Sequence, residues 1–118
     1  MQNFRTLKVW EKSHQLTLDI YKITQDFPKT EQYGLVSQLR RASSSIASNI
    51  AEGCGRGTDP DFRRMLQIAN GSASETDYQI ILSRDLGYVD KSKADLLESQ
   101  IIEIKRMLGG LINKLTTN

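Results

Sequence analysis

Residues 94–115 read ADLLESQIIEIKRMLGGLINKL, and the apolar residues of this stretch return at alternating steps of three and four. A strict seven-residue repeat is formed by Ala94, Leu97, Ile101, Ile104, Leu108, Leu111 and Leu115. This spacing puts one apolar stripe along a helix that packs beside others. We expect the helix to start at Asp90 or Ser92. Gly109 and Gly110 interrupt it at a cost of about 1 kcal/mol each relative to alanine, and predict a close contact or slight bend there.

The segment before this one predicts another long helix. Thr58 or Asp59 can cap its start, and Pro60 falls in the first turn, where the missing amide donor of proline costs nothing. Gly87 closes it. Its inward stripe is Phe62, Leu66, Ala69, Ala73, Thr76 and Ile80.

Two further helices are predicted in the first half of the chain. Residues 7–27 carry one apolar face, which ends where Pro28 biases the preceding residue away from helical angles. The next helix runs from Thr30 or Glu31 to Glu52, and Gly53 is expected to stop it in a left-handed conformation. Many alanines and serines make this second helix thin, which suits a packed interior or a contact between subunits.

The pattern contains no lasting alternation of polar and apolar residues, so no strand is predicted. Connections of roughly three to seven residues force sequential helices to lie antiparallel. The sequence therefore predicts an all-α protein, an up-down-up-down antiparallel four-helix bundle, with one domain over residues 1–118.

Composition agrees with a soluble protein. The 118 residues are 38% hydrophobic and 25% charged, and no apolar run approaches the ~20 residues that span a bilayer. The first residues lack the pattern of a secretory signal, so we expect a cytoplasmic protein with no membrane partner. The net charge of +2 is too small to attract polyanions by itself, so any nucleic-acid binding requires local clusters of charge.

A set of unusual small and charged residues recurs along nearly the whole chain. It comprises Val9-Trp10, Phe27-Pro28, Tyr33-Gly34-Leu35, Gln38-Leu39-Arg40-Arg41-Ala42, Ser45-Ile46, Asn49-Ile50-Ala51-Glu52-Gly53, Arg56, Phe62, Gly71-Ser72 and Glu75. In this order the residues resemble the four-helix-bundle proteins encoded within intervening sequences of bacterial 23S ribosomal RNA genes. The run from Tyr33 to Gly53 is the most specific part.

This resemblance implies a bacterial cytoplasmic protein that assembles as a homopentameric ring. The chain is also similar in fold to the accessory proteins of diversity-generating retroelements, which are thought to bind nucleic acid and a reverse transcriptase. The resemblance identifies the fold better than the activity.

Arginines supply the candidate nucleic-acid-binding residues. Five of the eight, Arg40, Arg41, Arg56, Arg63 and Arg64, fall within 25 residues. Guanidinium groups suit phosphate because their forked donors hold two oxygens at once. Antiparallel pairing puts Arg56, Arg63 and Arg64 near one end of the bundle, with Arg40 and Arg41 a few turns away.

A structural interpretation competes with this one. Arg40 or Arg41 can pair with Glu75, because a carboxylate beside an apolar stripe needs a partner. The other three arginines have Glu52, Asp59 and Asp61 nearby.

Catalytic and cofactor sites find little support. The segment 53–57 is rich in glycine but follows no predicted strand and lacks the lysine of a phosphate-binding loop. Cys54 lacks an evident base, and Glu11 with His14 is one Glu-x-x-His pair where a di-iron site needs two. We expect no enzyme activity, no metal and no cofactor.

Two functions follow from this reading. The first is a non-enzymatic, self-associating bundle that binds RNA or DNA, above all structured RNA or a ribonucleoprotein, by contacts to the backbone. The alternative is an adaptor that docks a nucleic-acid-processing protein, such as a reverse transcriptase or another polymerase, and contacts nucleic acid little.

Overall fold

The computed structural model describes residues 2–116, which leaves residues 1, 117 and 118 of the predicted domain outside it. Four long helices make up the fold: α1 (Lys8–Thr24), α2 (Leu35–Cys54), α3 (Asp59–Asp85) and α4 (Lys91–Thr116). Two short 3-10 helices, η1 (Phe4–Thr6) and η2 (Lys29–Glu31), precede α1 and α2. Residues 2–116 contain no strand, so the all-α prediction is confirmed.

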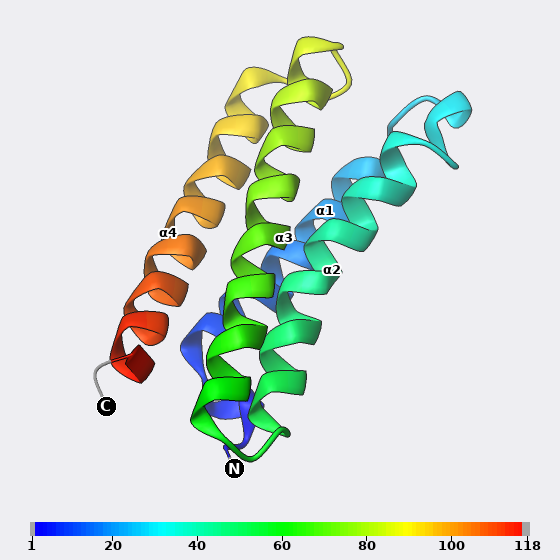
Figure 1. Ribbon diagram of the computed structural model, residues 1–118. Coiled ribbons are helices and arrows are strands. Elements are labelled where there is room, and N and C mark those ends of the chain that lie inside the picture. Colours follow the sequence, from blue (N-terminus) through cyan, green and yellow to red (C-terminus); the bar gives the residue numbers. More distant parts are fainter. Residues whose placement is uncertain (1, 117–118) are drawn as a thin grey trace.

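The helices form an elongated bundle of 47 × 22 × 20 Å. They alternate in direction, and the start of α1 and the end of α4 lie at the same end of the bundle as the α2–α3 loop (Figure 1). The predicted stripes form the core: the fully buried large side chains include Leu16, Ile20, Leu39, Ile46, Ile50, Leu66, Ile101, Ile104 and Leu108.

The predicted caps of the two long helices are present. The Thr58 hydroxyl accepts a hydrogen bond from the Asp61 amide at the start of α3. The Asp90 carboxylate accepts one from the Lys93 amide at 2.8 Å, at the start of α4. These bonds satisfy donors that have no partner within the helix.

Helices α1 and α2 are both bounded differently from the prediction. After Thr24 the amides of Gln25, Asp26 and Phe27 bond three residues back, so the last turn of the apolar face is tightened rather than α-helical. Helix α2 starts at Leu35, not at Thr30 or Glu31, because η2 and a turn occupy that segment.

The role predicted for Gly53 is wrong. It lies inside α2, and positive φ occurs at Gly57 and Gly87 within residues 2–116. A Cβ on Gly53 would lie 2.8 Å from Cδ1 of Phe62 and 3.0 Å from Cβ of Met65. The glycine therefore lets α2 and α3 approach closely.

Of the close contact or slight bend predicted at Gly109 and Gly110, the contact is absent from residues 2–116. Both glycines lie within α4, and a Cβ on either would meet nothing within 4 Å.

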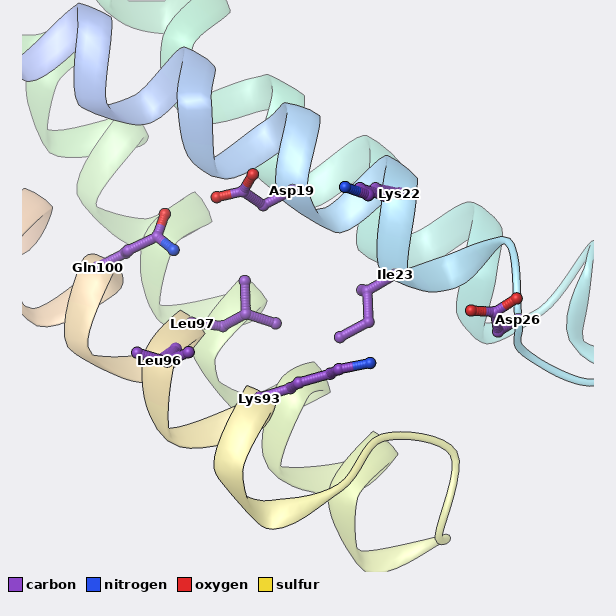
Figure 2. Close-up of a pocket in the computed structure, with 8 residues that line it drawn as sticks. All are labelled: Asp19, Lys22, Ile23, Asp26, Lys93, Leu96, Leu97 and Gln100. Atoms are coloured by element: carbon purple, nitrogen blue, oxygen red, sulfur yellow. The ribbon is translucent and has the colours of Figure 1, made fainter.

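The interface between α1 and α4 is open. A groove of about 450 Å³ lies between them, with Ile23, Leu96 and Leu97 among its lining residues (Figure 2). Leu96 is 64% exposed. A second hollow of about 270 Å³ continues the groove, since Asp19 and Gln100 line both.

Candidate nucleic-acid interface

The α2–α3 loop brings Arg56, Arg63 and Arg64 to one end of the bundle, as predicted. They do not share one environment. Arg56 is ion-paired with Glu52 at 3.3 Å, and both side chains are about half exposed. The Nε of Arg63 donates to the carbonyl of Ile112 on α4 at 3.4 Å, so Arg63 lies along the α3–α4 interface. Arg64 is exposed and has no hydrogen bond or ion pair from its side chain among residues 2–116.

Arg40 connects α1 with α2. Its Nε donates to the Thr24 hydroxyl at 2.9 Å, and its Nη2 donates to the Tyr21 carbonyl at 3.2 Å. The guanidinium also lies 4.6 Å from the centre of the Tyr21 ring, which adds a cation–π contact. The ion pair with Glu75 that we expected for Arg40 is therefore replaced by neutral partners on α1.

Arg41 points outward, as its place one residue after a flanking position predicts. It lines a recess of about 180 Å³ between α2 and α3 together with Glu75. The predicted neighbourhood of Arg41 and Glu75 is confirmed, whereas the predicted salt bridge between them is absent from the described residues.

Charge is divided unequally along the bundle axis. We call residues 2–16, 46–72 and 104–116 the basic pole: this half contains nine Lys and Arg against four Asp and Glu. The other half, the acidic pole, is residues 17–45 and 73–103, with seven basic and ten acidic residues. A chain of net charge +2 thus has a strongly positive end.

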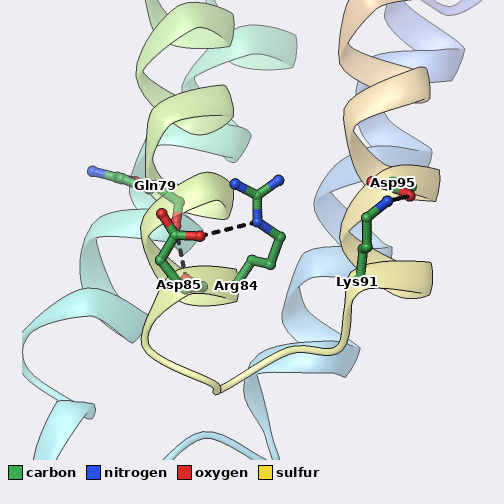
Figure 3. Close-up of polar contacts among 6 residues, drawn as sticks. Gln79, Arg84, Asp85, Lys91 and Asp95 are labelled. Carbon is green, nitrogen blue, oxygen red and sulfur yellow. Dashed lines mark hydrogen bonds and ion pairs between the residues drawn. The ribbon is translucent and has the colours of Figure 1, made fainter.

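Two cations of the acidic pole are paired with neighbouring carboxylates. Arg84 pairs with Asp85 at 3.1 Å and Lys91 with Asp95 at 2.9 Å (Figure 3). The exposed Arg64 at the basic pole has no such partner in the described chain.

Sequence reasoning missed the cations that the chain ends add to the basic pole. These are Arg5, Lys8, Lys12, Lys105, Arg106 and Lys114. The signal was available, because an up-down-up-down topology returns both ends of the chain to the α2–α3 loop. Several of them are engaged within the chain: Lys105 donates to the Ser74 hydroxyl at 2.6 Å, and Arg106 pairs with Glu103 at 2.8 Å. The Arg5 guanidinium lies 4.6 Å from the centre of the Phe4 ring, and Lys114 also has an interaction partner.

Two titratable groups have informative environments. A hydrogen bond from Arg106 lowers the pKa of Glu103, so that carboxyl stays ionised. Burial raises the pKa of Cys54, which disfavours the thiolate that a nucleophilic cysteine needs.

Among the described residues no three or more His, Cys, Asp or Glu converge as metal ligands do.

Within residues 2–116 no helix has both the length and the apolar character to cross a membrane.

Comparison with known proteins agrees with the fold. The family described as 23S rRNA-intervening sequence protein matches residues 5–110. A crystal structure from Bacteroides thetaiotaomicron, of a protein with unknown function from the S23 ribosomal protein family, superposes with a TM-score of 0.79 at 26% sequence identity. The alignment covers 88% of this chain and 97% of that chain. No curated protein matches. Because the family match extends over all four helices, this chain belongs to the 23S rRNA-intervening sequence protein family.

Proposed function

We propose that the protein is a non-enzymatic helical bundle that self-associates as a homopentameric ring and binds nucleic acid at its basic pole. The preferred ligand is structured RNA or a ribonucleoprotein. The observation that carries this proposal is the axial separation of charge, with the unpaired guanidinium of Arg64 exposed at the positive end of the described chain.

Binding at this pole would be mainly electrostatic. Lysines and arginines that neutralise phosphates release condensed counterions, which drives association without reading the base sequence. Arg64 contacts phosphate directly in this proposal. Arg56 exchanges its exposed carboxylate partner for phosphate at small cost, since exposed ion pairs contribute about 0–1 kcal/mol.

Self-association rests on the surface that the single chain leaves open. Its accessible area of 7040 Å² exceeds the roughly 6,500 Å² expected of a compact monomer of this mass. Exposed large apolar side chains include Ile68, Tyr78, Leu96 and Ile102. A ring would repeat the basic pole on one face, so weak contacts to one RNA add by avidity.

The test measures RNA affinity against salt. Replacing Arg56, Arg63 and Arg64 together with alanine should weaken RNA retention and flatten the plot of log K against log salt by about 0.7–0.9 for each phosphate that is no longer neutralised. Arg84→Ala at the acidic pole is the matched control and should leave both quantities unchanged. A triple variant that binds RNA like the parent would place the interface elsewhere.

Light scattering tests the assembly. A mass near five subunits at micromolar concentration supports the ring, whereas a mass of 13.4 kDa contradicts it. Cyclic symmetry gathers like-charged poles on one face. Moderate salt should therefore strengthen assembly while it weakens RNA binding.

A protein-docking adaptor is the second candidate, and the groove between α1 and α4 favours it. Its volume of about 450 Å³ and its exposed Leu96 suit apolar side chains of a partner such as a polymerase. The apolar part of such an interface, around Ile23, Leu96 and Leu97, depends little on salt. Leu96→Lys should then abolish capture of a candidate polymerase, and the arginine variants should retain it.

A further inference from the structure

The recess between α2 and α3 is lined mostly by polar and charged side chains. Its lining residues are Gln38, Arg41, Ala42, Ser45, Ser72 and Glu75. The α2 wall therefore presents a cation and the α3 wall an anion. Its volume of about 180 Å³ is below the ~300–1,000 Å³ of pockets that enclose drug-sized ligands, so it suits one small ring system.

A buried amide group supports two of the residues that line this recess. Gln79, which is 5% exposed, donates from Nε2 to Gln38 Oε1 and to Glu75 Oε2, each at 3.3 Å. The Gln79 Oε1 has no partner among the described residues. Gln79 does not itself line the recess, and its contribution is to hold Gln38 and Glu75, which do.

The two serines add a donor. Ser45 Oγ and Ser72 Oγ lie 2.9 Å apart, and Asn49 Nδ2 also donates to Ser45 Oγ at 2.9 Å. One hydroxyl proton is used between the serines, whichever of them donates. The other proton remains for a ligand. The recess thus combines a carboxylate acceptor, a hydroxyl donor and a guanidinium at the mouth.

We propose that this recess binds an unpaired guanine nucleotide, with the base edge on Glu75 and the phosphate on Arg41. This inference rests on the proposed binding of nucleic acid and names the element of RNA that is recognised. Guanine presents N1–H and N2–H side by side, and a carboxylate accepts both at once. Its neighbouring O6 accepts the spare serine proton.

The other three bases fit the Glu75 carboxylate poorly. Adenine and cytosine each place a bare ring nitrogen beside their amino group, and that lone pair would face the carboxylate. Uracil offers one N–H between two carbonyl oxygens. Recognition at the Watson–Crick edge requires an unstacked base, which loops and bulges of RNA supply.

The outer face of α3 leads from the recess to the basic pole. Glu75 lies eleven positions after Arg64, which is about 16 Å along a helix. Gly71 lies between them, and a Cβ there would meet nothing within 4 Å, so no side chain obstructs the path at that position. A single strand with one guanine in the recess can continue along α3 with a later phosphate on Arg64.

Titration of the full chain with mononucleotides tests the recess directly. Guanosine 5′-monophosphate should shift the amide resonances of Ala42 and Ser72, and adenosine 5′-monophosphate should bind at least about tenfold more weakly. Glu75→Gln leaves one acceptor in place of two and should remove the preference. Glu11→Gln, on exposed α1 surface, is the matched control and should retain it.

A charge exchange separates ligand binding from a simple ion pair. The double variant Arg41→Glu with Glu75→Arg restores any attraction between the two positions, and it should still lose guanosine monophosphate binding. Absence of shifts at Ala42 and Ser72 in the parent, equal shifts with the adenine nucleotide, or binding retained by the double variant would each overturn the proposal.

RNA binding is measured separately. RNA with a guanine in its loop should bind about tenfold more tightly than the same RNA with adenine there, and Glu75→Gln should equalise the two. If RNA binds at the basic pole with no guanine preference, the recess proposal fails alone. If the mononucleotide binds but RNA is not retained, the proposed function fails and the recess stands.

Discussion

The α2–α3 interface and the α1–α4 interface differ in how closely their helices pack. At the first, Gly53 has no side chain, so the two helices approach closely there, and the recess farther along the interface is about 180 Å³. At the second, a groove of about 450 Å³ remains and Leu96 stays exposed. This comparison indicates that small residues, more than large apolar ones, determine where two helices of this bundle come close together.

The largest expected effect is on the closed side of the bundle. Leu66→Ala deletes a fully buried side chain and should lower the free energy of unfolding by about 2–5 kcal/mol. Leu96→Ala in the groove should change it by no more than about 0.5 kcal/mol. Urea unfolding measures both. Equal losses would mean that the groove is closed in solution.

Alanine in place of two glycines should change stability in opposite directions. Gly53→Ala forces its new Cβ against Phe62 and Met65 and should destabilise the fold by about 1–3 kcal/mol. Gly110→Ala meets open space in a helix and should stabilise it by about 0.5–1 kcal/mol. The two alanines should therefore move the thermal midpoint in opposite directions, and a shared direction would contradict this account of Gly53.

A smaller difference in the free energy of unfolding is expected between variants of two neighbouring arginines. Arg40→Ala removes two hydrogen bonds and a cation–π contact between α1 and α2, at a cost of about 1–2 kcal/mol. Arg41→Ala should change the unfolding free energy by less than about 0.5 kcal/mol. Chemical denaturation of both variants decides whether Arg40 is the structural member of the pair.

The smallest effect concerns pH at the α1–α4 side. The Arg106 hydrogen bond lowers the pKa of Glu103 in the folded chain below its ordinary value of about 4.5. The ionised Glu103 carboxylate therefore contributes to the free energy of unfolding above about pH 4.5, and this contribution is lost as pH falls through the lowered pKa. Glu103→Gln should make unfolding less sensitive to acid below about pH 4.5, measured as the urea midpoint across pH. High salt should shrink the difference, since both groups are exposed.

Local pattern predicted most of the fold because each stripe is a property of its own helix. Residues such as Leu39, Leu66 and Ile101 occupy the core as their spacing requires. The prediction that Gly53 ends its helix was wrong because the role of Gly53 depends on Phe62 of another helix, and the spacing of residues along one helix does not reveal such a contact.

The candidate site was predicted less completely than the fold. Clustering found the arginines, and the outward positions of Arg41 and Arg64 followed from helix geometry. The partners of Arg40 were missed, since Thr24 and the Tyr21 carbonyl carry no charge to suggest them. The unsatisfied oxygen of Gln79 is a three-dimensional feature with no local signature.

The uneven distribution of charge has a kinetic consequence. A molecule that is positive at one end and negative at the other experiences a torque in the field of a polyanion before the two touch. It would approach with its basic pole first, so that more of the encounters begin in an orientation that can bind.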